Sequence, residues 1–267
     1  MAAERGKSQP YLLTDDGGVA VFRATAASPK RRVRLEGGIS GKRGLVPIPF
    51  PDWVLPDAGT DGHTVILSPD GALAFEFWNL HVLDGVFRAG QVAIVDMAGE
   101  GFHPGLSARA SGFSLMAGLV WPGEYRLGSI RHALVFVWPR TRKGKPVFPA
   151  TYSDGGGEHP ATLAMGTRIR LDPAFDLDSF GLDDGRKAIF RALQVYGAWL
   201  GDTGSFAFKG LSPRSSRDNP WEGQPGYSAE NGSIDLSALP VDRLQVMTVG
   251  AAGTNRVVVT FPDYYED

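Results

Sequence analysis

The stretch ALAFEFWNLHV, residues 72–82, places a carboxylate, Glu76, inside an apolar run that is typical of a β-strand. Side chains alternate between the two faces of a strand, so Leu73, Phe75 and Phe77 share one face, and Glu76 and Trp78 share the other. Aromatic rings stack on the apolar face of a pyranose, while carboxylates bind hydroxyls or transfer protons to a glycosidic oxygen. The pair therefore suits a sugar site. The alternative is that Glu76 faces water on an outer sheet layer.

A glycosidase typically needs a second carboxyl group, and the separation of the two decides between retention and inversion. Three candidates stand close to the predicted strands: Asp61 precedes the strand before Glu76, Asp96 ends the strand after it, and Asp202 follows a predicted helix. We therefore hypothesise that Glu76 is the acid/base or the nucleophile and that one of these aspartates is its partner. The choice among the three stays open at this stage.

A second candidate strand, IRHALVFVWP at residues 130–139, is apolar on both faces, which predicts a central position in a sheet. Alternation places His132 and Trp138 on one face. If Glu76 lies on that side, His132 becomes a candidate acid or base, because its charge changes near neutral pH. The alternative is a buried histidine bonded to one backbone group. We predict Trp78 and Trp138 as stacking platforms for a saccharide.

β-Elimination is an alternative to hydrolysis. In a polysaccharide lyase, a histidine or tyrosine takes the C5 proton of a uronic acid while a nearby cation neutralises its carboxylate. Tyr152 and Arg140 would then join His132 as candidates. The long polar segment at residues 211–233 carries Trp221, and a loop of this length is typically functional or disordered, so we predict a rim that covers a groove.

Metal and cofactor motifs are not apparent. The five histidines show no HExxH or HxH spacing, and there are no cysteines for a thiolate site, a disulfide or a nucleophile. The acidic run at residues 172–184 could hold a structural calcium, although an acidic entry into a helix N-terminus is the simpler interpretation. No GxSxG, GxGxxG or GxxxxGK[ST] motif is present. We therefore predict no cofactor.

Composition narrows the classes of partner. The chain has 27 basic and 29 acidic residues and a net charge of -2, which does not favour nucleic acid. No apolar span approaches the ~20 residues of a membrane helix, and residues 1–18 contain no apolar core of a secretory signal. We expect a monomer that binds neither nucleic acid nor a membrane, and whose partner is a polysaccharide or oligosaccharide.

The 35 glycines and 19 prolines are spread along the chain, as expected for many short strands joined by turns. Residues 63–80 form the pattern of a hairpin around Asp70 and Gly71. Residues 28–38 are a basic edge or loop, and residues 44–53 carry prolines that favour an extended covering segment. Further strands are predicted at 17–22, 86–97, 167–173, 204–210, 244–250 and 255–262.

One segment has helical periodicity. Residues 183–200 place apolar side chains at helical spacing, with Asp183 or Asp184 as the N-cap and Gly201 as the terminator. A shorter helical turn is expected near residues 112–125. We predict a single all-β domain over residues 1–267, a jelly-roll or concanavalin-like β-sandwich with this amphipathic helix packed on its outside, and residues 1–18 peripheral.

Several phrases together resemble a group of mostly uncharacterised, usually exported bacterial proteins. GSIRHALVF fits GxIxHALxF, PATYSDG fits PAxxSDG, and a helix ending in YG is followed by DTGS, which fits DxGS. The phrases occur in this order, and the resemblance covers roughly residues 60–210. It implies a β-rich, jelly-roll-like domain, an extracellular or periplasmic location and a role associated with polysaccharides.

These observations lead to one hypothesis and two rivals. The favoured function is a carbohydrate-active enzyme that cleaves a polysaccharide in a groove on one sheet, by hydrolysis or by elimination. The first rival is a non-catalytic carbohydrate-binding protein that uses the same tryptophans. The second is a structural or interaction domain in which the aromatic side chains form the core.

Overall fold

The computed structural model describes residues 9–36, 43–101, 103, 107–247 and 265–266. Within these ranges the protein is mainly β, with three sheets and two α-helices, so the expected fold class is confirmed. The sheets are not closed into a barrel. No helix in the described part of the chain has the length and apolarity that spanning a membrane requires.

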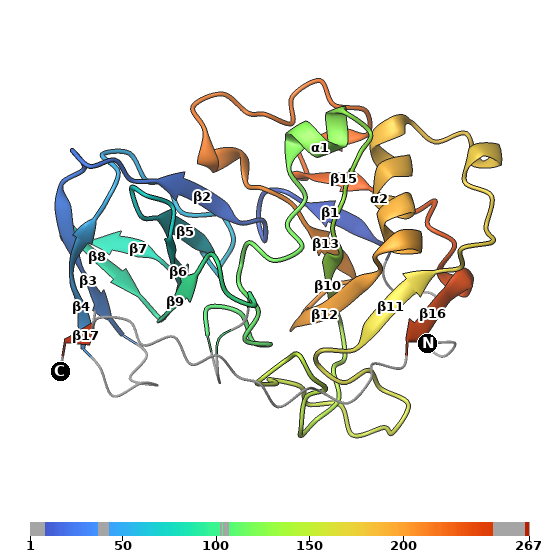
Figure 1. Ribbon diagram of the computed structural model, residues 1–267, viewed down its shortest axis with the longest axis horizontal. Helices are drawn as coiled ribbons and strands as arrows, with labels where there is room; N and C mark the ends of the chain where they lie inside the picture. The colour runs from blue at the N-terminus through green and yellow to red at the C-terminus, as the bar shows by residue number, and fades with distance from the viewer. Residues whose placement is uncertain (1–8, 37–42, 102, 104–106, 248–264, 267) are drawn as a thin grey trace.

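Two sheets pack face to face at the left of Figure 1. Phe50, Phe75 and Phe77 fill the space between them and are almost completely buried. The first sheet contains, in spatial order, β17 (Tyr265–Glu266), β4 (Gly44–Pro49), β3 (Lys30–Leu35), β8 (Val86–Ala89) and β7 (His81–Leu83). The second contains β2 (Ala20–Arg23), β5 (Thr64–Leu67), β6 (Leu73–Trp78) and β9 (Gln91–Asp96).

The described part of the basic segment at residues 28–38 is not the edge or loop that we expected. Its residues Lys30–Leu35 form β3, the middle strand of the five-stranded sheet. Its basic side chains face solvent while Val33 is fully buried, because a strand needs an apolar side chain only on its inner face. β4 also joins the ladder despite its prolines, pairing with β3 along most of its length.

The third sheet has eight strands and lies at the right of Figure 1. Its strands are, in spatial order, β14 (Tyr227–Ser228), β15 (Ser233–Asp235), β1 (Tyr11–Leu13), β13 (Ala207–Lys209), β10 (Leu134–Trp138), β12 (Ala198–Thr203), β11 (Arg168–Leu171) and β16 (Leu244–Met247). β10 is central, as predicted. Residues 11–13, expected to be peripheral, instead form an interior strand with Leu12 fully buried. The strand predicted at 255–262 lies outside the described residues.

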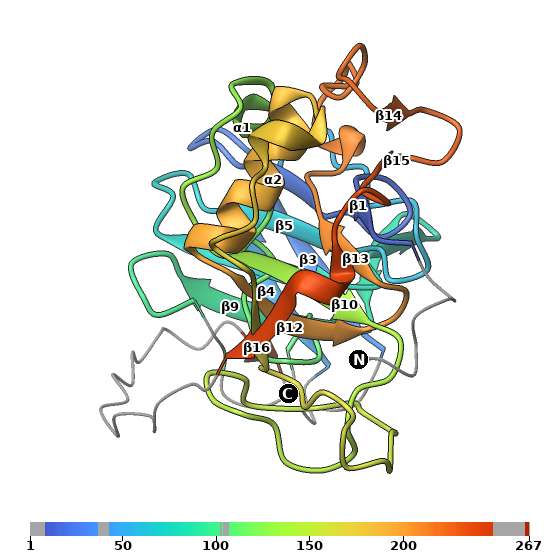
Figure 2. The same cartoon turned by 90° about the vertical axis from the view of Figure 1, so that its right-hand side faces the viewer.

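The amphipathic helix α2 (Asp184–Val195) covers the outer face of this sheet (Figure 2). Asp183 caps its N-terminus by accepting a hydrogen bond from the Arg186 backbone N–H at 2.9 Å, as predicted. The helix ends earlier than expected, because Gly197 adopts a left-handed φ of 74° and the chain turns directly into β12. The expected short helical turn is α1 (Pro122–Arg126).

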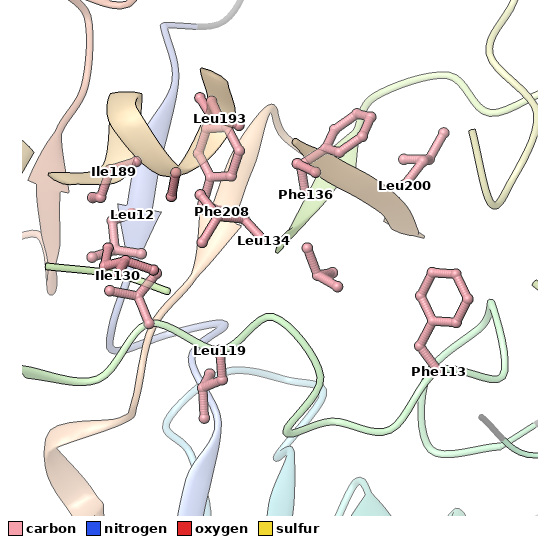
Figure 3. Close-up of a cluster of buried hydrophobic side chains, with 14 of the residues drawn as sticks. Leu12, Phe113, Leu119, Ile130, Leu134, Phe136, Ile189, Leu193, Leu200 and Phe208 are labelled. Atoms are coloured by element: carbon pink, nitrogen blue, oxygen red, sulfur yellow. The ribbon is translucent and has the colours of Figure 1, made fainter. Parts of the chain in front are cut away.

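The four-stranded sheet is a middle layer with both faces covered. Its second face carries Val65, Ala74 and Ala93, which belong to a different buried cluster from the phenylalanines of the first face. That face packs against the segment 107–120. Figure 3 shows Phe113 and Leu119 of this segment on one side of the strands of the eight-stranded sheet. Ile189 and Leu193 of α2 lie on the other side of these strands. The segment 107–120 therefore lies between the four-stranded and eight-stranded sheets.

Candidate functional site

Glu76 lies in the middle of β6, and its side chain points into the layer formed by the segment 107–120. It is fully buried, so the expected open groove and the alternative of a solvated outer face are both wrong. The Ser114 hydroxyl donates to Oε1 at 2.5 Å, and the Leu115 backbone N–H donates to Oε2 at 2.8 Å. Burial raises the pKa of Glu76 to about 7, while these hydrogen bonds and the charge of Arg109 oppose the rise.

Arg109 is the cation that faces Glu76, and it too is almost completely buried. Its Nη1 donates to the carbonyls of Ser114 and Ala117 at 2.9 and 3.3 Å, and its Nη2 donates to that of Leu115 at 3.2 Å. Arg109 thus binds the carbonyl groups of the turn at residues 114–117. Glu76 binds hydrogen-bond donors of the same turn. The two opposite charges hold residues 114–117 in one conformation.

Asp202 comes close to these groups because β12 contains a bulge. Phe136 pairs with Leu200 but Val137 pairs with Asp202, so Gly201 is an extra residue in the ladder. A Cβ atom on Gly201 would lie 2.6 Å from Val135 Cγ1, and only glycine fits there.

Asp202 itself is partly exposed at the end of this bulge. Burial of its carboxyl group raises its pKa to about 6, and the negative charges of Asp154 and Asp61 raise it further, whereas Lys209 and Arg109 oppose the rise. Asp202 and Asp61, two of the carboxyl groups that the sequence analysis singled out, are therefore near enough for their charges to interact.

Trp78 fixes the position of Asp61. The indole Nε1 donates to Asp61 Oδ1 at 2.9 Å, and the Asn79 backbone N–H donates to the Asp61 carbonyl at 2.5 Å. The indole ring packs so closely on Gly90 that a Cβ atom there would lie 2.5 Å from it. Trp78 is half-buried and is the aromatic side chain that accompanies the carboxyl pair.

Lys209 and His63 complete the site and were not assigned roles from the sequence. Lys209 projects from β13, is 4% exposed and donates from Nζ to the Gly17 carbonyl at 2.5 Å. His63 Nε2 lies 3.1 Å from the Ala108 carbonyl oxygen, and burial together with the charge of Lys209 lowers its pKa to about 3. In the sequence, the feature that could have marked Lys209 as a site residue is its position as the only charged residue of the strand GSFAFKG. We call six residues the charged cluster: Asp61, His63, Glu76, Arg109, Asp202 and Lys209.

Asp96 lies away from the charged cluster. It pairs with Leu73 at one end of the β6–β9 ladder, whereas Trp78 pairs with Gln91 at the other. Five residues of strand separate the two ends by about 17 Å. The Asp96 carboxylate accepts from the Ala98 backbone N–H at 2.9 Å, as is typical of a turn.

His132 is also elsewhere, so the condition for its role, a position on the same side as Glu76, is not met. β10 begins at Leu134, four residues later than we expected, and His132 lies in the turn before it. Its Nε2 is 3.2 Å from the Glu124 carboxylate on α1, and its Nδ1 is 2.9 Å from the Ala133 carbonyl oxygen. His132 therefore pairs with α1 at the surface.

Two of the predicted sugar-binding tryptophans belong to the core. Trp138 is 7% exposed, and its ring meets the edge of Phe206 at 4.9 Å between centroids. Trp221, expected on a loop rim, is fully buried, and its Nε1 donates to the Leu211 carbonyl at 2.7 Å. The remaining candidates, Tyr152 and Arg140, are exposed on the connection between β10 and β11.

The described residues contain no group of three histidine, aspartate or glutamate side chains that could hold a metal ion. In the acidic run, Asp183 caps α2, and Asp172 and Asp176 accept hydrogen bonds from backbone N–H groups two residues further on. These contacts are those of an acidic entry into a helix.

The phrases that carry the resemblance meet at the charged cluster. Asp202 and Thr203 belong to the DxGS phrase, and Asp154 belongs to the SDG phrase. The Thr203 hydroxyl donates to Asp154 Oδ1 at 2.6 Å, which joins the two phrases beside Asp202. The family itself stays a prediction: comparison of the chain with family models, with curated proteins and with solved structures finds no match.

Proposed function

We propose that the protein is a carbohydrate-active enzyme in which Asp202 transfers the proton and Asp61 is the second carboxyl group. The observation that carries the proposal is that these two partly exposed carboxyl groups interact electrostatically beside Arg109 and Lys209. A carboxyl group whose pKa is near 6 can hold a proton near neutral pH and deliver it to a leaving group. Arg109 and Lys209 balance the negative charge.

The proposed reaction is hydrolysis of a glycosidic bond. Asp202 donates its proton to the glycosidic oxygen as the C–O bond breaks, and Asp61 acts at the anomeric carbon as nucleophile or activates a water as base. Trp78 holds Asp61 in place through its indole N–H and offers the aromatic surface for the sugar ring. Glu76 takes no part in proton transfer in this scheme, because it is fully buried.

A non-catalytic carbohydrate-binding protein is the second candidate. It is favoured by the burial of Glu76, His63 and Lys209, since groups without access to solvent stabilise the fold and do not contact a polymer. Such a protein would use Asp61 and Trp78 for binding alone. An extracellular or periplasmic location is proposed for either candidate on the strength of the resemblance, which implies exported proteins.

The test compares Asp202→Asn with the matched variant Asp96→Asn. Release of reducing ends from a panel of polysaccharides should fall about 10²–10⁴-fold in Asp202→Asn, because the proton donor is lost. Asp96→Asn should keep full activity, since Asp96 lies at the far end of β6 and β9. Unchanged turnover in Asp202→Asn overturns the assignment. If a saccharide raises the melting temperature of the wild-type protein but is not cleaved by it, the protein is a binding protein.

A further inference from the structure

A pocket of about 400 Å³ lies on the same face of the eight-stranded sheet as Lys209 and Asp202. Strands β10 and β12 form its floor, and the segment 107–120 forms one wall. Its lining includes Phe113, Ala117, Val135, Phe148 and Trp199. The volume is within the range of about 300–1,000 Å³ that is usual for small-molecule sites.

Most of the side chains in the described part of the lining are apolar, and three of them are aromatic rings, those of Phe113, Phe148 and Trp199. Among the described lining residues, Glu100 is the one with an ionisable side chain. A sugar ring placed here would lose hydrogen bonds from water to its hydroxyls and gain few in return. A flat aromatic ring without hydroxyl groups gives up no hydrogen bonds to water when it enters the pocket. It gains contact with the faces or edges of three aromatic rings.

We propose that this pocket binds a small molecule through an uncharged aromatic ring. This site is separate from the carboxyl pair, and the proposal holds with or without catalysis at Asp202. The two sites share a wall, because a Cβ atom on Gly201 would lie 3.6 Å from the Phe113 ring and 3.3 Å from Arg109 Cδ.

The pocket is formed before any ligand arrives. Gly118 has a φ of 68°, and a Cβ atom on it would lie 2.4 Å from the Val135 backbone nitrogen, so the segment 107–120 is seated directly on β10. Arg109 holds the Ala117 carbonyl from behind. A wall fixed in this way needs no ordering on binding, which lowers the free-energy cost of association.

Trp199 is also held in place. The guanidinium of Arg168 lies 5.3 Å from the centre of the indole ring, and its Nη2 donates to the Tyr196 carbonyl at 2.5 Å. A cation beside one aromatic ring stabilises the orientation of that ring. Because Arg168 already supplies a positive charge beside Trp199, an uncharged ring needs no further counter-charge to bind there.

The test measures binding of benzyl alcohol to the full chain by calorimetry and by ligand-detected NMR, with methyl α-glucopyranoside as the contrasting ring. Wild-type protein should bind benzyl alcohol and show no binding of the glucoside at the same concentration. Phe148→Ala should weaken binding of benzyl alcohol by about tenfold or more, since one wall of the aromatic site is removed. Ala133→Phe, which places a ring inside the pocket, should abolish it.

Phe180→Ala is the matched control, because Phe180 is 41% exposed and Phe148 is 44% exposed, and Phe180 does not line the pocket. Its affinity for benzyl alcohol should equal that of the wild type. The proposal is overturned if benzyl alcohol does not bind, if Phe148→Ala binds it as well as Phe180→Ala does, or if the glucoside binds more tightly. Phe148→Ala changes an exposed side chain, so the comparison stands even if Ala133→Phe fails to fold.

Discussion

At the scale of single residues, Glu76 shows how a buried acid can organise a layer of irregular chain. Its carboxylate binds the donors of the turn at residues 114–117, and Arg109 binds the acceptors of the same turn. The pair therefore makes the position of the segment 107–120 sensitive to protonation.

Glu76→Gln should change how stability depends on pH. The pKa of Glu76 is 4.5 in its unperturbed state and about 7 in the folded protein, so the folded state holds the proton more tightly between these values. The stability that this group contributes is present in full below pH 4.5 and is lost as the pH rises through 7, by about 3 kcal/mol for a shift of this size. Glutamine does not titrate and avoids this loss.

The measurement is the free energy of unfolding by urea at pH 5 and at pH 8. The difference between Glu76→Gln and wild type should move in favour of the variant at the higher pH. Asp202 titrates in both proteins and cancels in this difference. A difference that is the same at both pH values would show that Glu76 is not the group that titrates.

At the scale of elements, one aspartate joins the two helices. Asp183 accepts a hydrogen bond from the Arg186 backbone N–H, forms an ion pair with the Arg186 side chain and accepts a hydrogen bond from the Tyr125 hydroxyl of α1 at 3.1 Å. The start of α2 and its contact with α1 therefore depend on the same carboxylate.

Asp183→Ala should lower the free energy of unfolding by about 1–2 kcal/mol, because the N-cap is lost together with these side-chain contacts. Asp183→Asn should lose less of the free energy of unfolding than Asp183→Ala, since the amide oxygen still caps the helix. The control is Asp184→Ala, in which an exposed residue of the first turn is changed without removing the cap. Equal losses in Asp183→Ala and Asp184→Ala would contradict the role of the cap. Urea unfolding measures all three.

The sequence predicted those features that depend on neighbours along the chain. Alternation placed Glu76 opposite Phe75 and Phe77, and the start of α2 at Asp183 followed from a capping residue before an apolar period. The start of β10 was placed four residues too early, because an apolar run does not mark where its ladder begins.

The charged cluster could be predicted only in part, since it depends on contacts between distant segments. Trp78 bonds to Asp61, and Lys209 bonds to Gly17, across loops that no periodicity describes. Trp221 was mistaken for a surface residue because its loop is polar. That loop folds back so that the indole lies beside Tyr125, with 5.9 Å between ring centroids.

At the scale of the whole molecule, the four-stranded sheet belongs to two cores. One face packs on the five-stranded sheet through Phe75 and Phe77, and the other packs through Val65 and Ala74 on the segment 107–120. Loss of either core therefore exposes a face of the same sheet. We expect the two halves of the molecule to unfold together.

Phe77→Ala tests this coupling. The substitution should lower the free energy of unfolding by about 3–5 kcal/mol, the usual cost of removing a buried phenylalanine. Trp138 and Trp221 lie in the other core, so their fluorescence should change at the same urea concentration as the far-ultraviolet circular dichroism. Two separated transitions would show that the cores are independent. Val82→Ala, in an exposed position of β7, is the control and should change stability little.

The position of β1 has a consequence for synthesis of the chain. Tyr11 pairs with Ala207 on one side and with Asp235 on the other, so this strand is completed only by residues that lie 196 and 224 positions further along the chain. At about 5–20 residues per second, the ribosome needs roughly 10–40 s to supply these partners. During that time Leu12 has no core to enter, and the nascent chain carries an unpaired strand edge that a chaperone could shield.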